Sequence, residues 1–248
     1  ASAWLADGAD PTAKVGVVGI PSSIASLSPS GARTAPAALR EALRGFATFH
    51  SDRSIDLAPL TIYDHGDLTI DDSSMSSSQA DIENGIAALP RNEILAIVGG
   101  DNAITRPAIK ALAGDLARVG VVTLDAHHDV RLLDDGPSNG TPIRGLIEDG
   151  LPGLNIVQIG IHSFANSHAY RSYCEENGIT TLTAAAVEEQ GSAATAATAL
   201  ARLAHCEWIY VDFDIDVLDR AFAPGCPGAR PGGLTPRQLG DLAYHMGV

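Results

Sequence analysis

The stretch that decides the fold is Trp208-Ile-Tyr-Val-Asp-Phe-Asp-Ile-Asp-Val-Leu-Asp219, an apolar run that turns into carboxylates at every second residue. A β-strand points residues i, i+2 and i+4 to one side, so we expect Asp212, Asp214 and Asp216 to project together from its C-terminal end. Like charges at this spacing repel, and burying an ionised carboxylate without a partner is costly. The pattern therefore predicts a site for a divalent cation.

A second apolar run ends in the same way, at Val121-Val-Thr-Leu-Asp125-Ala-His127-His128-Asp129. It offers Asp125, His127 and Asp129 at i, i+2 and i+4. Because the carboxyl ends of parallel strands meet at one edge of an open sheet, we expect both clusters to form one site, with enough donors for two ions. Oxygen-rich ligation with a little imidazole favours Mn²⁺ over Zn²⁺ or copper. The alternative is that each acidic run is a solvated strand exit with Asp acting as a turn or helix cap.

Composition limits the classes of partner. A chain of 248 residues with 45% hydrophobic content can bury a large core. Its net charge of −14 argues against a nucleic-acid partner, because a phosphate backbone would be repelled. No apolar run is long enough to span a membrane and the N-terminus does not resemble a signal peptide, so we predict a soluble, cytoplasmic protein without a membrane partner. The three cysteines lack CxxC spacing, which argues against disulfides and a zinc knuckle.

Short buried strands alternate with helices after a lead-in over residues 1–13. This alternation predicts one α/β domain, a three-layer α/β/α arrangement with a central, mainly parallel sheet. A loop at 132–141 is long enough to fold over the cluster of Asp125, His127 and Asp129. The expected strands cover residues 14–20, 60–63, 93–98, 119–124, 155–161, 179–182 and 207–213. The expected helices cover 35–45, a segment that ends near 89, 105–113, 167–177, 193–205 and a segment that begins near 235.

The acidic clusters belong to a longer series of motifs. Gly31-Ala-Arg, Gly66-Asp67, Gly99-Gly-Asp101, Asp125-Ala-His-His-Asp129, Gly140-Thr-Pro142, Asp214-Ile-Asp-Val-Leu-Asp219, Ala223-Pro-Gly and Pro231-Gly-Gly-Leu-Thr235 follow one another along the chain. Together they resemble the ureohydrolase family, which comprises arginases, agmatinases and formimidoylglutamases. The likeness covers nearly the whole chain. It implies an arginase-like α/β fold with a binuclear manganese centre that hydrolyses a carbon–nitrogen bond of a guanidine or an amidine.

The resemblance also implies a role for each matching residue. Asp125 and Asp214 would bridge the two ions, Asp129 would complete one site, and His127 with Asp216 would complete the other. Asp219 would support these ligands from behind. We predict that His127, Asp129 and Asp216 are catalytic as well as metal-binding, with Asp129 or Asp216 carrying a proton during the reaction.

Two residues depart from the family pattern. Asn102 stands after Gly-Gly-Asp, where the family usually has a metal-binding histidine; we predict that it is a metal ligand, and because an amide is a poorer ligand, one ion should be held weakly. Asn139 stands before Gly-Thr-Pro, where arginases and agmatinases have a histidine, and it cannot shuttle protons at neutral pH. We therefore expect Asn139 to bind substrate.

The end of the chain is a third departure. In the family another strand follows the Gly-Gly-Leu-Thr helix and supplies a glutamate near the substrate nitrogen, whereas this sequence stops at Val248. Either the sequence is part of a longer chain or that segment is absent. The expected organisation is a single ureohydrolase-like catalytic domain over residues 1–248, in which the C-terminal strand and helix of the family either lie outside this sequence or are absent.

Three arginines indicate the charge of the substrate. Asp129-Val-Arg131 resembles the formimidoylglutamase version of the motif, and a guanidinium there can grip a carboxylate bidentately. Arg144 and Arg230 border the same pocket by motif position, although each alone is more often a surface ion pair. Three arginines around one acidic metal site suit a substrate with two carboxylates, and they would repel a cationic one.

The predicted function is hydrolysis of the formimino carbon–nitrogen bond of N-formimino-L-glutamate to L-glutamate and formamide, a step of histidine degradation, with two Mn²⁺ per chain. One alternative is another ureohydrolase activity, on agmatine, arginine or a guanidino acid. The other is a non-catalytic relative that binds a metal or a ligand. We also predict a homo-oligomer. His128, His162 and Cys226 lie close to these motifs, and we expect all three to pack in the structure rather than bind metal.

Overall fold

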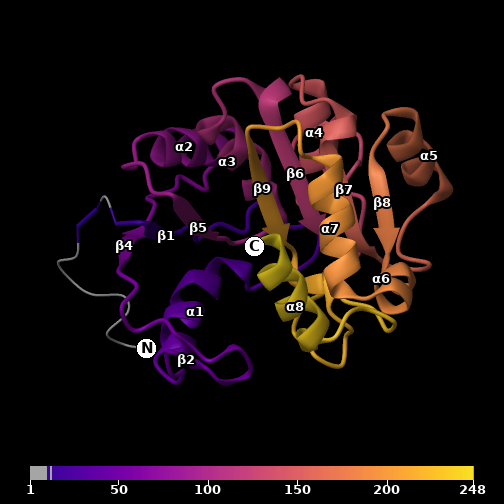
Figure 1. Cartoon of the computed structure of the whole chain (residues 1–248). Coiled ribbons are helices and arrows are strands. Elements are labelled where there is room, and N and C mark those ends of the chain that lie inside the picture. Colours follow the sequence, from indigo (N-terminus) through magenta and orange to yellow (C-terminus); the bar gives the residue numbers. More distant parts are fainter. Residues whose placement is uncertain (1–9, 12, 248) are drawn as a thin grey trace. The chain divides into compact units, whose positions relative to one another are not determined.

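The computed structural model describes residues 10–11 and 13–247 (Figure 1), so most of the expected lead-in lies outside the described residues. The chain divides into two compact units. The first contains the described residues of Ala1–Ser26 and Ser30–Leu112, and the second those of Leu27–Pro29 and Ala113–Val248. Among the described residues, no helix combines the length and the apolar character needed to cross a bilayer.

The first unit is built on a parallel three-stranded sheet in the order β4-β1-β5. Its strands are β1 (Val15–Gly19), β4 (Ile62–Asp67) and β5 (Ile94–Val98). Its helices are α1 (Ala35–Leu43), α2 (Met75–Ala87) and α3 (Thr105–Leu112), and α2 begins at an N-cap in which the Ser74 hydroxyl accepts from the Ser77 amide. A small antiparallel pair, β2 (Phe49–His50) with β3 (Ile55–Asp56), was not expected from the sequence.

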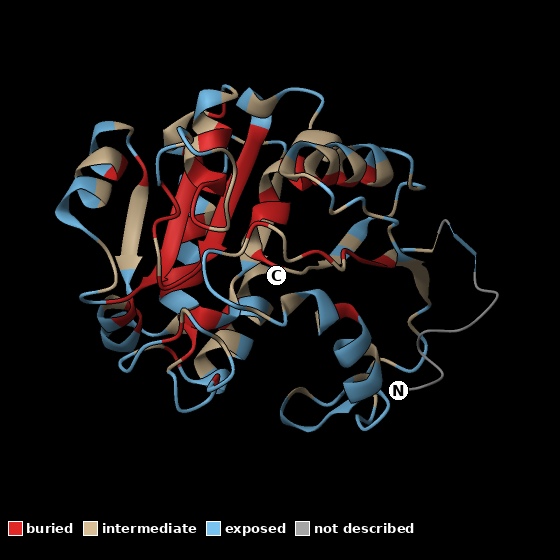
Figure 2. Ribbon diagram, turned by 180° about the vertical axis from the view of Figure 1, so that it is seen from behind, coloured by how far each residue is buried: buried red, intermediate tan, exposed pale blue. Residues whose placement is uncertain are grey.

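The second unit contains a parallel four-stranded sheet in the order β8-β7-β6-β9. Its strands are β6 (Val119–Leu124), β7 (Ile156–Ile161), β8 (Thr180–Thr183) and β9 (Trp208–Phe213). Every residue of the central strands β6 and β7 is buried (Figure 2), which explains their continuous apolar runs. Leu124 pairs with Phe213, so β6 and β9 end level with each other. This register places the two acidic clusters at the same edge of the sheet.

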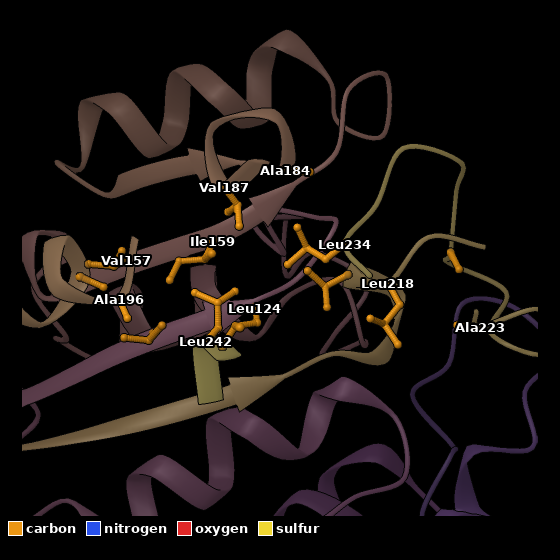
Figure 3. Close-up of a cluster of buried hydrophobic side chains, with 14 of the residues drawn as sticks. Leu124, Val157, Ile159, Ala184, Val187, Ala196, Leu218, Ala223, Leu234 and Leu242 are labelled. Carbon is orange, nitrogen blue, oxygen red and sulfur yellow. The ribbon is translucent and has the colours of Figure 1, made fainter. Parts of the chain in front are cut away.

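Three helices pack against this sheet around one apolar core. They are α6 (Ala184–Gln190), α7 (Ser192–Arg202) and α8 (Pro236–Met246). The core joins Leu124 and Ile159 of the sheet with Val187 of α6 (Figure 3), and it extends to Leu218 and Leu234 in the loop that follows β9. Each fully buried leucine or isoleucine contributes about 1.5–3 kcal/mol relative to an exposed one. The loop after β9, which carries Asp214 and Asp216, is therefore anchored in the core.

Most expected elements are present, but two helices were not anticipated. The helix α4 (Pro142–Glu148) starts at the residue after Thr141, with proline in its first turn, a start signal that the sequence contains. The helix α6 is separated from α7 by Gly191, whose φ of 83° lies in the left-handed region and ends the helix. The remaining helix, α5 (His168–Glu176), matches the expected segment. The strands expected at 119–124 and 207–213 are confirmed within one residue.

Candidate metal centre

The first acidic cluster lies in the loop directly after β6. The backbone amide of Asp125 donates to the carbonyl of Ile159 on β7, at 3.0 Å, and the Asp125 carboxylate accepts from the amide of His127, at 2.6 Å. The strand ends at Leu124, so strand periodicity does not align the cluster. Asp129 has a φ of 53°, in the left-handed region that few residues other than glycine adopt. A strained loop, rather than the strand, therefore sets the directions of these side chains.

The second cluster follows β9 in a different way. The strand ends at Phe213, and Asp214 caps a 3₁₀ turn, η6 (Ile215–Val217), by accepting from the amide of Asp216 at 3.0 Å. The expectation that strand spacing aligns Asp212, Asp214 and Asp216 is therefore wrong. Asp212 remains in the strand, and Asp216 is on the turn. The short polar side chain of Asp214 stabilises a turn more readily than an extended strand, which is why the strand stops there.

The two loops meet at Asp216. One oxygen of its buried carboxylate accepts from the amide of Ala126, at 3.1 Å, and the other lies 2.9 Å from Nδ1 of His127. The same nitrogen is 3.5 Å from a carboxylate oxygen of Asp125. Asp125, His127 and Asp216 each offer one donor atom, and the three atoms lie within 4.8 Å of one another. This spacing is suited to a single metal ion.

Burial and mutual repulsion disfavour the ionised form of the carboxylates in this centre. The pKa of Asp125 is raised well above its usual value by burial, and then by the charges of Asp129, Asp216 and Asp214. Burial likewise raises the pKa of Asp214, with Asp216 adding to the effect. A divalent cation among these groups would replace repulsion with attraction. The donor set therefore fits a metal ion of the kind that prefers oxygen ligands.

His127 is the one imidazole of this cluster. Burial acts to lower its pKa, but the hydrogen bond and the charge of Asp216 outweigh burial and raise it. The reciprocal effect appears at Asp216, where burial raises the pKa and the hydrogen bond from His127 outweighs it, so that the pKa is lowered. Both shifts favour a protonated His127 beside an ionised Asp216 when no metal is bound, and a bound cation would compete with that proton.

Two amide side chains hold the β6 loop, and sequence reasoning missed both. Asn166 accepts from the amide of His128 at 3.0 Å and donates to the carbonyl of Ala126 at 2.9 Å. Gln158, buried on β7, donates to the carbonyl of His128 at 2.9 Å, and its oxygen lies 2.6 Å from Nδ1 of the same histidine. As expected, His128 is packed in the structure. These contacts link residues far apart in sequence, so no local sequence pattern predicts them.

The β9 loop is held by its own residues and by β7. The carboxylate of Asp219 accepts from the amides of Ala221, at 2.8 Å, and Gly232, at 2.7 Å, and these bonds lower its pKa. His162, buried after β7, has Nε2 3.0 Å from the carbonyl of Val217. Its Nδ1 is buried and has no hydrogen-bond partner among the described residues. The structural role expected for His162 is thus confirmed, and Asp219 supports the loop from outside the metal cluster.

Cys226 lies closer to the centre than expected. Its Sγ and one carboxylate oxygen each from Asp214 and Asp216 lie within 4.8 Å of one another. The thiol is half-buried, and its pKa is raised by burial first and then by the charges of the two carboxylates. The sequence indicated only a small packed thiol, because the spacing between Cys226 and the aspartates does not resemble a metal-binding motif.

Two of the expected substrate-binding residues are neighbours. The amide of Arg131 donates to the carbonyl of Gly140, at 3.0 Å. The Arg131 side chain covers Gly140 so closely that a Cβ there would lie 2.7 Å from its Cδ. Next to Gly140, the side-chain oxygen of Asn139 accepts from the amide of Leu27, at 3.0 Å. The end of the 132–141 loop thus places the side chain of Arg131 against Gly140, the residue that follows Asn139.

The other two arginines differ from each other. Nε of Arg144 donates to the carbonyl of Val130, at 2.8 Å, and its guanidinium lies 3.8 Å from the centroid of the Tyr173 ring. These contacts occupy Arg144 in packing. Arg230 is exposed and donates to the carbonyl of Pro227, at 3.0 Å, yet its charge acts on the centre, since it works to lower the pKa of His127. Arg230 is therefore the better placed of the two to meet an anionic ligand.

Asn102 belongs to the first unit, at the start of the 3₁₀ turn η3 (Asn102–Ile104). The turn is capped by the buried Asp101, whose carboxylate accepts from the amide of Ala103 at 3.1 Å and from the hydroxyl of Ser26 at 3.0 Å. The side-chain oxygen of Asn102 accepts from the hydroxyl of Thr105, at 3.0 Å. Its role as a metal ligand stays a prediction.

Comparison with known proteins agrees with this geometry. Residues 13–247 match the arginase family. The chain is 42% identical over 238 residues to a formimidoylglutamase of Halalkalibacterium halodurans, covering 94% of this chain and 75% of that protein. It is 35% identical over 236 residues to the formimidoylglutamase of Bacillus subtilis, covering 93% and 74%.

The fold is shared with solved structures. The crystal structure of the Bacillus subtilis formimidoylglutamase superimposes with a TM-score of 0.88 at 33% identity, covering 97% of this chain and 76% of that one. The expected three-layer α/β/α class is thereby confirmed, and the resemblance inferred from the acidic motifs is confirmed as well. This chain belongs to the arginase family.

Proposed function

We propose that this protein is a formimidoylglutamase, which hydrolyses N-formimino-L-glutamate to L-glutamate and formamide in histidine degradation. The observation that carries the proposal is the 42% identity to a formimidoylglutamase over 94% of the chain. The acidic cluster at the carboxyl edge of β6 and β9 is the site of the reaction. Activity on agmatine, arginine or a guanidino acid is less favoured, because the 42% identity to a formimidoylglutamase exceeds the 35% identity to a guanidinopropionase and the 33% identity to an agmatinase.

The cofactor of this reaction is a pair of Mn²⁺ ions. Asp125 and Asp214 would hold both ions, Asp129 would complete one site, and His127 with Asp216 would complete the other. The raised pKa values of Asp125 and Asp214 support this assignment, because a dication relieves the repulsion that raises them. When bound, such ions supply a hydroxide nucleophile at neutral pH and stabilise developing negative charge.

The sixth protein ligand in this proposal is Asn102. An amide oxygen carries no full charge, so the ion that it completes is bound less tightly than its neighbour. Titration of metal-free protein with Mn²⁺ should then show two unequal steps, and Asn102→His should tighten the weaker one. Equal affinities, unchanged by the substitution, would show that Asn102 does not bind a metal.

The protein's own residues must also move a proton. The attacking water loses one, and the departing glutamate nitrogen gains one. The carboxylates of Asp129 and Asp216 are the groups proposed to carry it, since Asn139 does not titrate at neutral pH. The hydrogen bond from His127 lowers the pKa of Asp216, so Asp216 is a weaker base while that bond persists. His127 therefore orients the carboxylate of Asp216 and sets its basicity.

Substrate recognition rests on charge. N-formimino-L-glutamate carries two carboxylates, and Arg131 and Arg230 are the guanidinium groups proposed to bind them, with Asn139 beside Arg131. Arg144 contributes less, because its guanidinium is engaged by Val130 and Tyr173. A substrate with a free cationic end, such as agmatine, would meet repulsion from the same arginines.

One assay separates these activities. The purified chain, supplied with Mn²⁺, is given formiminoglutamate, agmatine, arginine and guanidinobutyrate in parallel, and formamide, ammonia and urea are measured. We expect formamide from formiminoglutamate and little urea from the other three. Robust urea release from agmatine would overturn the proposal, and no product from any substrate with two ions bound would favour a non-catalytic relative.

A further inference from the structure

The loop after β9 adds a donor that the proposed reaction does not use. Cys226 is a free cysteine in the described part of the chain, and it is half-buried. Its Sγ and one carboxylate oxygen each from Asp214 and Asp216 all lie within 4.8 Å of one another. Two carboxylates and a thiol form a different donor set from the oxygen-rich one proposed for manganese.

The backbone around Cys226 holds the thiol in this place. Its amide donates to the carbonyl of Ala223, at 3.1 Å, and its carbonyl accepts from the amide of Ala229, at 3.3 Å. Two residues on, Gly228 lies against Asp216, since a Cβ there would be 2.1 Å from a carboxylate oxygen. Only glycine lets the loop approach this closely. The position of the sulfur relative to the carboxylate is therefore built into the turn.

Asp216 is held from the opposite side as well. Its carboxylate accepts from the amide of Ala126 and lies against His127, so it cannot swing away from the loop without losing both contacts. Asp214 is held by capping the turn that carries Asp216. The three donors are thus held in place by linked contacts, and a cation that binds them needs little rearrangement.

We propose that Asp214, Asp216 and Cys226 form a binding site for a thiophilic divalent cation, Zn²⁺ or Cd²⁺, that overlaps the manganese centre. Binding breaks the S–H bond, releases the proton to solvent and forms a sulfur–metal bond, with no change in oxidation state. Thiolate sulfur favours these ions over Mn²⁺. Because Asp214 and Asp216 serve both sites, a thiophilic ion and the manganese pair exclude each other. The enzyme should therefore lose its manganese to such ions.

Spectroscopy tests this without any substrate. Metal-free protein is titrated with Cd²⁺, and the near-ultraviolet charge-transfer absorbance of a cadmium–thiolate bond is recorded. We expect the absorbance of one thiolate per chain. Cys226→Ser, which keeps a small polar side chain, should lose that absorbance and bind Cd²⁺ at least about 10-fold more weakly. Its affinity for Mn²⁺ should change little.

Cys206→Ser is the matched control. Cys206 is also half-buried and in the same unit, but it precedes β9 and lies near Gly120, at the other end of the sheet strands. This variant should keep the full absorbance. Absorbance that survives in Cys226→Ser, or that is missing from the unmodified protein, would overturn the proposal.

Competition tests the overlap of the two sites. Mn²⁺ added first should suppress the cadmium–thiolate absorbance. In the unmodified protein, the Mn²⁺ concentration needed for this suppression should be higher than the Cd²⁺ concentration needed to displace bound Mn²⁺. Full absorbance in the presence of saturating Mn²⁺ would show that the sites do not share ligands. The proposal depends on the proposed function only through the shared carboxylates, so the cadmium titration gives its result whether or not formiminoglutamate is the substrate.

Discussion

The two loops that carry the acidic clusters reach the same place by different means. The β6 loop, with Asp125 and His127, is held by amide side chains of Gln158 and Asn166, which lie 30 and 38 residues away from His128 in sequence. The β9 loop, with Asp214 and Asp216, is held mainly by its own 3₁₀ turn and by the nearby Asp219, and His162 adds one contact to the carbonyl of Val217. Local contacts dominate in one half of the centre and tertiary contacts dominate in the other.

This difference teaches where the centre can be disturbed. A self-contained turn resists changes elsewhere in the protein, because its hydrogen bonds are made within a few residues. A loop held from outside depends on partners that belong to another strand and another loop, and the left-handed φ of Asp129 adds strain that those partners must offset. We expect the β6 loop to be the more sensitive half of the centre.

Removing Asp125 or Asp214 should have the largest effect, because each carboxylate is proposed to bind both ions. Asp214→Ala or Asp125→Ala should release both ions and lower kcat by at least about 1,000-fold, since the metal centre contributes several kcal/mol to the reaction. The fold should persist by circular dichroism. Metal content by mass spectrometry is the direct measure, and two tightly bound ions in either variant would refute the shared ligand assignment.

Releasing the outside clamp tests the comparison itself. Asn166→Ala leaves the amide of His128 and the carbonyl of Ala126 without their partner, which should cost about 1–3 kcal/mol of stability. Mn²⁺ affinity should fall about 10- to 100-fold, by the scale of supporting contacts around a metal. Asn177→Ala is the control, because its amide donates to the carbonyl of Tyr173 in α5. Equal metal affinity in the two variants would show that Asn166 does not support metal binding.

Each half also contributes one arginine, and the two can be compared. Arg131→Ala should raise KM for formiminoglutamate about 10- to 150-fold, the equivalent of 1.5–3 kcal/mol for a lost charged hydrogen bond, with kcat and metal content nearly unchanged. Arg230→Ala should show a smaller rise, since its guanidinium is also engaged by Pro227. Arg237→Ala, at an exposed ion pair with Asp241, controls for lost positive charge. An unchanged KM in Arg131→Ala would indicate that Arg230, and not Arg131, binds the substrate carboxylates.

The smallest effect should be the pH dependence of metal-free stability. Because the pKa values of Asp125 and Asp214 are raised, the folded protein holds protons that the unfolded chain releases. The contribution of these protonated carboxyl groups to stability is therefore present in acid and is lost as pH rises through the raised pKa values. With Mn²⁺ the trend should reverse, because binding requires the ionised carboxylates. The gap in Tm between metal-loaded and metal-free protein should widen with pH.

Asp125→Asn supplies the check on this trend. An amide at this position does not titrate, so the Tm of the metal-free variant should fall less steeply with rising pH than that of the unmodified protein. A slope identical to that of the unmodified protein would show that Asp125 does not titrate in the folded state over this range.

Most of the strands and helices and the kind of chemistry were predictable from the sequence. The strands at 119–124 and 207–213 follow from short apolar runs, because burial on both faces is a local property of the chain. The carboxylates and the imidazole of Asp125, His127, Asp214 and Asp216 were identified because their residue types alone restrict what they can bind. The family resemblance rested on the same residues.

How those donors meet could not be predicted, because it depends on contacts between distant segments. Asp216 reaches Ala126 and His127 through a turn and not along a strand, because the capping of Asp214 ends β9 first. Arg144 is drawn to the ring of Tyr173, and Asn166 clamps the β6 loop, through contacts between segments that are distant in sequence. Neither follows from a local pattern, since a hydrogen-bond partner is chosen by which segments pack together. The placement of Cys226 beside two carboxylates is a product of that same packing.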